Sequence, residues 1–597
     1  MINWIPPVTI FILGAMLVPL FKGKARQLYV LTIPVIGLAN ILAMESGTEW
    51  TYGYLRYDLI FGQVDKLSMV FGYVFVIMAF IGVLYSLHVK EHGHFIAGFL
   101  YVGSALGVVF SGDLFSLFIF WEIMAFSSVF LIWFQKEKAS IDAGFRYLLV
   151  HTAGGLCLLA GIVLRVVETG SLEFGHIGLD GLDTYLILIG FLLNAAVPPL
   201  HAWLADAYPE ATIVGAVFLS AFTTKTAVYV LLRAYSGTEI LMWLGAFMAI
   251  FGVCYAVLEN DIRRILGYHI ISQVGYMVCG VGIGTYMAIN GSAAHAFAHI
   301  LYKGLLFMST GAIIYSTGFR KLTDLGGLYK KMPITLIMYM VAGFAISGMP
   351  LFSGFVSKTM VIAAAEHDHH YIIFLMLMLA SIGTFLSVGI KLPYFAFFGK
   401  DRGIEAKDPP VNMLAGMGIA AFLCILIGVY PKVLYDLLPY EVHFQPFTIP
   451  HVVGELQLLM FTALGFFLLL KKLHVEPTIT LDIDWTYRKG SKVFMWFINE
   501  PLARGSQWTV DICLVIISFL KWFSKNPVLA VMLFKDSLTL RFIGHLGGRT
   551  RRDSISYLED EKKHYPRDPV KRNPVGDSLL LALMFMAVYV MYYLFTA

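Results

Sequence analysis

Charged residues are scarce in this sequence. Asp, Glu, Lys and Arg together make up only 14% of the 597 residues, whereas soluble proteins contain roughly 25%. Apolar residues make up 58%, the mean hydropathy is +0.75, and the excess extends along nearly the whole chain. These values exclude an ordinary soluble domain and indicate a polytopic protein embedded in the lipid bilayer.

Cysteine is also rare, and no cofactor motif is evident. The five cysteines stand apart, mostly inside apolar stretches, and no CxxC pair occurs. This spacing excludes a disulfide framework and an iron–sulfur ligand set, so we interpret the cysteines as small buried apolar side chains. The net charge is only +4, with the basic residues mostly between the apolar runs, so no nucleic-acid surface is indicated. We expect no metal site and no cofactor.

Long apolar runs are what the chain contains instead. Windows of about 20 apolar residues predict an all-α polytopic membrane protein with about 16 transmembrane helices. Their expected positions are 5–21, 28–44, 67–88, 95–111, 114–134, 146–167, 184–204, 213–235, 239–258, 265–286, 293–317, 333–365, 371–397, 412–430, 452–470 and 578–596. In the first run the basic residues follow the apolar ones, the reverse of a cleavable signal peptide, so we expect this span to remain.

The basic residues alternate between the loops. If the N-terminus lies outside, the loops predicted to lie inside contain most of the lysines and arginines, including those at 22–26, 263–264, 320–331 and 400–407. The opposite loops contain few. This asymmetry follows the positive-inside rule and predicts a cytoplasmic (inner) membrane protein with both termini outside.

Two spans are interrupted by proline at apparent membrane depth. The interruptions lie in "NAAVPPLHAWLADAYPEAT" (194–212) and "ISGMPLFSGFVSK" (346–358). Glu122 lies 77 residues before Pro199, and Gln273 lies 77 residues before Pro350. Each half contains about five spans, and an odd number places two copies in opposite orientations, as in inverted-repeat transporters. Such broken helices are tolerated where they line a polar cavity or are buried in protein.

The chain is expected to divide into six segments. They are N-terminal helices 1–94, a first inverted repeat 95–236, a second 237–398, C-terminal core helices 399–471, a cytoplasmic or interfacial connector 472–577 and a final span 578–597. The apolar stretch of the connector is interrupted by Lys521, Lys525 and Pro527, which favours helices lying at the interface. A hairpin of two short spans is the alternative. The charged stretch 549–573 is expected to be a solvated linker.

Ionisable residues occur within several spans. A charge at the centre of a span costs roughly 2.5–3.5 kcal/mol, so Glu122, Lys225, Lys303 and Lys358 together cost about 10 kcal/mol before any pairing. Function is therefore the default interpretation. Glu122 and Lys225 form the natural acid–base pair, because each stabilises the charged form of the other. A structural role for each residue is the alternative.

The stretch "HAFAHILYKGLLF" (295–307) contains His295, His299 and Lys303 at intervals of four residues. On a helix these side chains lie along one face. Because histidine changes charge near neutral pH, the pattern indicates a proton relay. Bis-histidine haem ligation, with His151 or His269 as a partner, is an alternative.

Other polar residues lie near the two interruptions. Lys358 follows the second one and is a further candidate for proton transfer. Lys391 is a weaker candidate, because it is close enough to a cytoplasmic span end to snorkel. His201, Asp206 and Glu210 follow the first interruption and would line a half-channel mouth or simply end a helix.

Six segments, in order between about residues 60 and 400, resemble a known family. They are "FWEIMAF", "VPPLHAWLADAYPEAT", "ENDIRRILGYHIISQVGYM", "HAFAHILYKGLLF", "DLGGLYKKMP" and "GMPLFSGFVSK". They are similar to the antiporter-like subunits shared by respiratory complex I and Mrp-type sodium/proton antiporters, and look closest to the D-type subunit of the Mrp antiporters. The resemblance implies a core of 14 helices with two inverted five-helix repeats and a central axis of charged residues that carries protons through half-channels.

The resemblance extends to single residues. Glu122, Lys225, His299, Lys303 and Lys358 match the positions at which the family carries its charged axis. The chain departs from the family in two places. Asn194 stands where a lysine is usual, which leaves the Glu–Lys pair of the first half incomplete. Gln273 stands where some members carry a histidine. We regard both as candidates for half-channel lining.

The C-terminal extension resembles that of the largest complex I subunit of this type, whose lateral helix runs along its neighbours. The resemblance therefore predicts that residues 500–545 contact partner subunits. The expected function is a proton-translocating subunit of a multi-subunit assembly that exchanges H⁺ for Na⁺ or another monovalent cation. Alternatives are a membrane subunit of a redox-driven pump of the complex I or hydrogenase type, a non-translocating scaffold, and a haem-bearing redox enzyme.

Overall fold

The computed structural model describes residues 5–54, 57–472, 475–476, 482–542, 549–567 and 575–596. The chain divides into two compact units, Met1–Asp484 and Trp485–Ala597. Thirteen of the described helices are long and apolar enough to cross a membrane, and four shorter apolar helices accompany them. The prediction of a helical, multi-pass membrane protein is confirmed.

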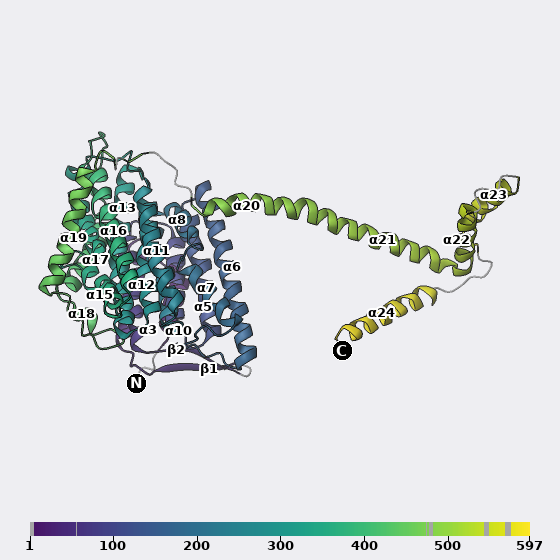
Figure 1. The fold of residues 1–597 in the computed structure, drawn as a ribbon, viewed down its shortest axis with the longest axis horizontal. Helices are drawn as coiled ribbons and strands as arrows, with labels where there is room; N and C mark the ends of the chain where they lie inside the picture. Colours follow the sequence, from purple (N-terminus) through teal and green to yellow (C-terminus); the bar gives the residue numbers. More distant parts are fainter. Residues whose placement is uncertain are drawn as a thin grey trace. The chain divides into compact units, whose positions relative to one another are not determined.

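The first unit is a helical bundle (Figure 1). Its N-terminal part contains α1 (Pro7–Leu17), α2 (Gly23–Leu42), α3 (Lys66–Tyr85), α4 (His92–Phe110), α5 (Leu114–Trp133), α6 (Lys138–Thr169), α7 (Leu182–Asn194), α8 (Ala202–Ala207), α9 (Ile213–Ala221) and α10 (Thr223–Ala234), with 3₁₀ turns η1 (Val18–Leu20) and η2 (Tyr208–Glu210). An aspartate caps the N-terminus of two of these helices. The side chain of Asp65 accepts the Ser68 N–H at the start of α3, and that of Asp113 accepts the Ser116 N–H at the start of α5, so both satisfy otherwise unpaired helix donors.

The rest of this unit contains α11 (Glu239–Leu258), α12 (Ile262–Ile283), α13 (Tyr286–Thr317), η3 (Leu328–Lys330), α14 (Pro333–Ser347), α15 (Ser353–His367), α16 (Tyr371–Thr384), π-helical turns η4 (Phe385–Lys391) and η5 (Tyr394–Phe398), α17 (Val411–Val429), α18 (Lys432–Tyr435) and α19 (Ile449–Leu468). The most apolar windows of α12 and α13 are 100% and 94% buried, whereas that of α19 is 22% buried. Helices α12 and α13 are therefore the centre of the bundle.

Both predicted interruptions are real breaks in helices. Helix α7 ends at Asn194 and α8 begins at Ala202, while α14 ends at Ser347 and α15 begins at Ser353. A third break was not predicted, because the apolar run 213–235 reads as continuous. It lies at Phe222, whose φ and ψ of −102° and −67° separate α9 from α10.

A short antiparallel hairpin lies between α2 and α3. Its strands are β1 (Glu49–Tyr54) and β2 (Tyr57–Gln63), and the Ile60 N–H donates to the Asp113 carboxylate at 2.7 Å. The aromatic and β-branched residues of both strands favour extended backbone. A search for 20-residue apolar windows could not detect elements this short.

The second unit contains α20 (Asp484–Phe497), the π-helical turn η6 (Ile498–Leu502), α21 (Ala503–Lys525), α22 (Pro527–Phe542), α23 (Arg549–Lys563) and α24 (Val575–Thr596). Residues 488–525 form one helical stretch of sufficient length and hydropathy to cross a membrane. Interfacial helices, which the sequence favours for this region, stay a prediction; the structure adds that one helix is long enough to span, because it begins before residue 500 and continues through η6. The expected linker 549–573 is helical up to Lys563, and its last residues, 568–573, lie outside the described part.

Candidate functional site

Five of the candidate residues are fully buried at the centre of the bundle. Lys225 belongs to α10, His295, His299 and Lys303 belong to α13, and Lys358 belongs to α15, and each is 0% exposed. Isolated buried charges are costly unless other groups compensate them. The contacts of each side chain therefore indicate what it can do.

Lys225 is hydrogen-bonded at the helix break that was not predicted. Its Nζ donates to the Ser220 carbonyl at 2.6 Å and to the Thr224 hydroxyl at 3.0 Å. The break at Phe222 frees the carbonyl of Ser220 from the regular helical pattern, so that it can accept this bond. Among the described residues no ion pair joins Lys225 to Glu122, so the acid–base pair expected from the sequence is not a direct contact.

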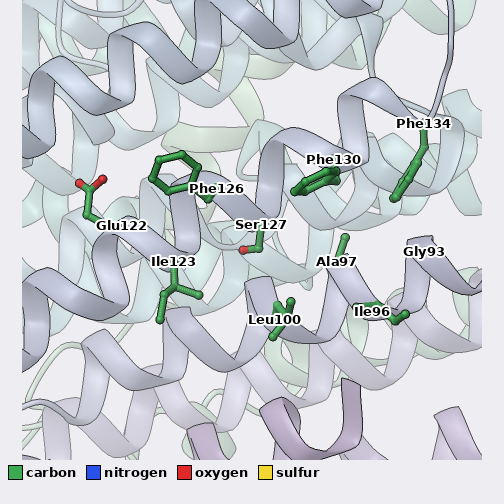
Figure 2. A pocket seen from close by; sticks show the side chains of 10 residues that line it. All are labelled: Gly93, Ile96, Ala97, Leu100, Glu122, Ile123, Phe126, Ser127, Phe130 and Phe134. Atoms are coloured by element: carbon green, nitrogen blue, oxygen red, sulfur yellow. The ribbon is translucent and has the colours of Figure 1, made fainter. Parts of the chain in front are cut away.

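Glu122 lies on α5 against the backbone of α6. A Cβ added to Gly155 would lie 1.9 Å from Glu122 Oε1, so the carboxyl group occupies space that only glycine leaves free. Glu122 also lies at one end of a cavity of about 430 Å³ between α4 and α5, with Phe130 and Phe134 toward the other end (Figure 2). The carboxyl group is therefore half-buried at the edge of an apolar space.

The predicted ladder lies on one continuous helix, α13. The His295 and His299 ring centroids are 6.1 Å apart, and the His299 and Tyr302 centroids are 5.2 Å apart. His295 Nδ1 lies 3.4 Å from the Ser357 hydroxyl. Neither ring nitrogen of His299, nor Nζ of Lys303, has a hydrogen-bond partner within the described part of the chain. These buried polar atoms are therefore unpaired within the described residues.

Gln273 connects this ladder to α16. It accepts from the Tyr302 hydroxyl at 3.3 Å and donates to the Thr384 hydroxyl at 3.3 Å. One turn earlier on α12, the His269 ring is hydrogen-bonded to the Ser387 hydroxyl. Gln273 is therefore part of the buried polar network. His269, considered from the sequence only as a haem ligand, belongs to it as well.

Lys358 has a neighbour that sequence reasoning missed. Its Nζ donates to the Ser381 hydroxyl at 2.8 Å and to the Ser347 carbonyl at 3.1 Å, at the end of the broken helix α14. Glu455 of α19 is 5% exposed, and both Glu455 Oε1 and Lys358 Nζ lie about 3 Å from a Cβ added to Gly348. Glu455 is the single acidic residue inside the apolar run 452–470, so the criterion that selected Glu122 would also have selected it.

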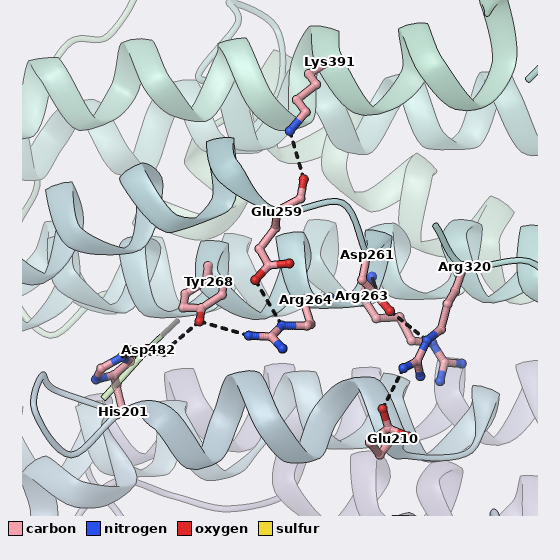
Figure 3. Close-up of polar contacts among 10 residues, drawn as sticks. All are labelled: His201, Glu210, Glu259, Asp261, Arg263, Arg264, Tyr268, Arg320, Lys391 and Asp482. Atoms are coloured by element: carbon pink, nitrogen blue, oxygen red, sulfur yellow. Dashed lines mark hydrogen bonds and ion pairs between the residues drawn. The ribbon is translucent and has the colours of Figure 1, made fainter. Parts of the chain in front are cut away.

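A second polar network lies beside α12 and joins several loops (Figure 3). Lys391 is 6% exposed and donates to the backbone carbonyls of Val257 and Glu259 at 2.6 and 2.9 Å. It is therefore anchored rather than extended into solvent. Asp206 and Glu210 form ion pairs, each 2.7 Å long, with Arg146 and Arg320 respectively. Asp206 therefore ties α8 to α6, and Glu210 ties η2 to the loop after α13.

His201 contacts a residue of the connector. Its Nε2 lies 3.1 Å from both carboxylate oxygens of Asp482, which also accepts from the Tyr268 hydroxyl at 2.7 Å. Burial raises the pKa of Asp482, but the bonds with His201 and Tyr268 hold it below its usual value. Asp482 was not predicted, because an aspartate in a polar stretch after the last core helix gives no local signal.

Asn194 ends α7 and is 1% exposed. Neither polar atom of its amide has a hydrogen-bond partner among the described residues. In the described ranges, no group of three His, Cys, Asp or Glu side chains could hold a metal ion.

Comparisons with known proteins show which family the chain resembles. Residues 111–387 match the family described as NADH:quinone oxidoreductase/Mrp antiporter, TM. The N-type subunit of the NADH-quinone oxidoreductase of Desulforudis audaxviator is 30% identical over 400 residues, which cover 62% of this chain and 79% of the relative. The D-type subunit of the Na⁺/H⁺ antiporter of Alkalihalophilus pseudofirmus is 29% identical over 435 residues, which cover 66% of this chain and 87% of that protein.

A solved structure has a similar fold over most of this chain. A chain of the membrane-bound sulfane sulfur reductase, an archaeal respiratory membrane complex, superposes with a TM-score of 0.72 at 24% identity, covering 86% of this chain and 99% of that chain. At this identity the likeness concerns the fold alone. The sequence matches identify the relationship: the chain belongs to the family of NADH:quinone oxidoreductase and Mrp antiporter membrane subunits.

Proposed function

We propose that this chain translocates protons as one subunit of a multi-subunit cation/proton antiporter or a related complex, exchanging H⁺ for Na⁺ or another monovalent cation. The observation that carries the proposal is the row of fully buried His and Lys side chains through α10, α13 and α15. Burial of ionisable side chains within membrane spans is costly and marks functional sites by default. The relative from Alkalihalophilus pseudofirmus is named as a subunit of a Na⁺/H⁺ antiporter.

In this proposal the protons pass along Glu122, Lys225, His295, His299, Lys303, Lys358 and Lys391. Within the described chain the His299 nitrogens and Lys303 Nζ have no hydrogen-bond partner, which supports a transfer role for the ladder. Asn194, His201, Asp206, Glu210 and Gln273 would line the entrances. No resident cofactor is proposed.

We further propose that residues 95–236 and 237–398 are inverted repeats. Helices α5 and α12 both begin after a capping aspartate, Asp113 and Asp261. Each of these aspartates forms an isolated β-bridge with a residue 60 positions later, Glu173 and Lys321 respectively. Breaks then follow at Asn194 and Ser347. The same order of features in both halves supports an internal duplication.

The basic residues and one exposed helix indicate how the chain is oriented in the membrane and what it contacts. The distribution of lysine and arginine supports a cytoplasmic membrane location with both termini outside. Helix α21 buries none of its residues within the chain and exposes large apolar side chains such as Trp508, Val515 and Phe519. Other membrane subunits of the assembly would cover them.

A redox-driven pump is the second candidate. The relative from Desulforudis audaxviator is named as a subunit of an NADH-quinone oxidoreductase, and the same proton path could serve either energy source. The two candidates differ in what drives the flow. An antiporter moves protons when a cation gradient is imposed, whereas a redox pump requires an electron donor and acceptor.

The test uses the whole complex reconstituted in vesicles. Lys225→Ala and Lys303→Ala are expected to lower cation-dependent proton movement at least about tenfold, equivalent to about 1.4 kcal/mol. Lys24→Ala, at an exposed lysine of α2, is the matched control and is expected to behave like the wild type. Undiminished proton movement in both variants of the buried lysines would leave the scaffold interpretation standing instead.

A further inference from the structure

The ammonium group of Lys358 is surrounded by oxygen atoms at the second helix break. Its Nζ donates to the Ser381 hydroxyl at 2.8 Å and to the Ser347 carbonyl at 3.1 Å. A third, longer contact of 3.4 Å reaches the carbonyl of Ile346. All four residues are fully buried. Three oxygen atoms from α14 and α16 therefore converge on one positive charge.

Pro350 explains why these two carbonyl groups face a side chain. In a continued helix the Ile346 carbonyl would accept from the N–H of residue 350, and proline has none. The N–H groups of Gly348 and Met349 bond to carbonyls earlier in α14. Within the described chain no backbone N–H pairs with the carbonyls of Ile346 and Ser347. They lie at the C-terminal end of α14, which is the negative end of its dipole.

A buried carboxyl group borders the same position. A Cβ added to Gly348 would lie 3.0 Å from Glu455 Oε1 and 3.1 Å from Lys358 Nζ. The two atoms are therefore no further apart than the sum of these distances. Glu455 is 5% exposed, and its Oε1 has no hydrogen-bond partner among the residues that the structure describes. Because buried polar atoms are normally paired, this oxygen is a candidate ligand for a cation.

Other buried lysines lack this combination of groups. Within the described ranges, the Lys225 Nζ bonds to two oxygen atoms, one carbonyl and one hydroxyl. Lys391 bonds to two backbone carbonyls, and the carboxylate of Glu259 beside it is already paired with Arg264 at 3.2 Å. Of these three lysines, only Lys358 has three oxygen contacts and an unpaired carboxyl oxygen nearby.

Oxygen atoms of this kind are suitable ligands for a dehydrated monovalent cation. Backbone carbonyls replace the hydration shell of K⁺ in channel filters. The C-terminal ends of broken helices and unwound carbonyls coordinate Na⁺ in transporters. The Lys358 ammonium group carries the same single positive charge, so its position marks where these oxygen atoms stabilise such a charge.

We propose that the oxygen atoms around Lys358 form a binding site for a dehydrated monovalent cation, Na⁺ or K⁺, which takes the place of the ammonium group. The ligands are the carbonyls of Ile346 and Ser347, the Ser381 hydroxyl and the Glu455 carboxylate. This inference names where the exchanged cation binds, and it rests on the proposed function. The ammonium group and the cation compete for the same oxygen atoms, so the site holds one of them at a time.

The test measures equilibrium binding of radioactive Na⁺, and separately of K⁺, to the whole purified complex. Lys358→Met removes the competing ammonium group and keeps every proposed ligand. Because apparent affinity scales with the fraction of molecules whose site is available, this variant is expected to bind one of the cations about tenfold more tightly than the wild type. Lys225→Met is the matched control, because it removes a buried lysine that is also bonded to a carbonyl and a hydroxyl group. It is expected to bind both cations as the wild type does.

The carboxylate and the hydroxyl group are tested in the Lys358→Met background. Glu455→Gln is expected to weaken binding there about tenfold and Ser381→Ala about threefold, because the charge and number of oxygen ligands set the affinity for hard cations. Glu122→Gln is the matched control in the same background. It changes another carboxyl group whose Oε1 is buried and unpaired in the described part of the chain, and it is expected to leave binding unchanged.

Binding is measured without transport, so failure of this inference and failure of the proposed function are distinguishable. Wild-type affinity for both cations in Lys358→Met would overturn the site, even where Lys225→Ala abolishes proton movement in vesicles. Equal binding with and without Glu455→Gln in the Lys358→Met background would also overturn it. Tighter binding that Glu455→Gln reverses would support the site, even where Lys225→Ala and Lys303→Ala leave proton movement undiminished.

A second variant decides if Lys358→Met does not assemble. Lys358→Gln removes the charge but keeps a polar side chain that can bond to the same carbonyl and hydroxyl groups. It is expected to bind one of the cations about fivefold more tightly than the wild type, since the competing charge is absent. Binding no tighter than that of the wild type would overturn the site.

Discussion

The two halves of the helical unit position their ionisable groups differently. In the second half, His295, His299 and Lys303 share α13 and are spaced by the helix itself. In the first half, Glu122 and Lys225 belong to α5 and α10 and do not touch. Spacing along one helix thus follows from the order of residues, whereas spacing between helices depends on packing. The first half is therefore more sensitive to small changes at helix contacts.

The largest expected effect concerns the contact between α5 and α6. Gly155→Ala adds a Cβ where Glu122 Oε1 now lies, so the carboxyl group must move by about 1 Å or more. Displacements of this size can cost up to about 10²-fold in a reaction step. We expect proton movement in vesicles to fall by about tenfold or more while the complex still assembles.

Two other glycines serve as a control and as a test of the second half. Gly418→Ala on α17 is the control, because nothing lies within 4 Å of the added Cβ. Gly348→Ala tests the second half, where φ is +82° and the new Cβ approaches Glu455 and Lys358 at about 3 Å. It is expected to reduce both transport and thermal stability, because alanine in the left-handed region is strained. Equal transport by Gly155→Ala and Gly418→Ala would contradict the placement of Glu122.

A smaller effect is expected from Glu455→Gln. The change removes the charge of the carboxylate near Lys358 without altering the size of the side chain. Because the charged forms of neighbouring acid and base stabilise each other, we expect proton movement to fall about fivefold, or about 1 kcal/mol. Glu441→Gln in the exposed segment after α18 is the control. A wild-type rate for Glu455→Gln would assign Glu455 to structure alone.

The anchor between His201 and Asp482 is expected to affect stability more than transport. Asp482→Asn removes the charge of a buried, hydrogen-bonded carboxylate, which typically costs about 1–3 kcal/mol. The thermal unfolding midpoint of the complex is expected to fall, and Asp436→Asn, at an exposed site, serves as the control.

The same anchor predicts a dependence on pH. Because the pKa of Asp482 is lowered in the folded protein, its stabilisation is fully present above the ordinary carboxyl pKa of about 4. It is lost as the pH falls through the lowered value. The difference in unfolding midpoint between wild type and Asp482→Asn is therefore expected to narrow in acid. A difference that widened toward low pH would contradict the anchor.

The smallest effects are expected from removing the helix-capping aspartate of each half. Asp113→Ala removes acceptors for the Ser116 and Ile60 N–H groups and is expected to cost about 1 kcal/mol. Asp261→Ala also removes a 2.7 Å ion pair with Arg320, so it is expected to cost slightly more. Thermal unfolding measures both, with the exposed Asp58→Ala as the control. A larger loss in Asp113→Ala would reverse the expected order.

Much of the architecture could be predicted from the sequence. Apolar windows located most core helices, and prolines located the breaks after Asn194 and Ser347. The break at Phe222 could not be predicted, because no proline or glycine marks it. The continuous helix 488–525 was not predicted, because Lys521, Lys525 and Pro527 interrupt the apolar stretch of the connector in the sequence.

Local patterns in the sequence were enough to establish a helical membrane protein in which α13 presents His295, His299 and Lys303 on one face. These properties follow from hydropathy and from the 3.6-residue period of the helix, which act locally along the chain. The folded structure was needed to show that Glu122 lies against Gly155, that Glu455 lies near Lys358, and that Asp482 reaches His201. Such contacts join residues far apart in sequence, and they depend on how helices pack rather than on any local pattern.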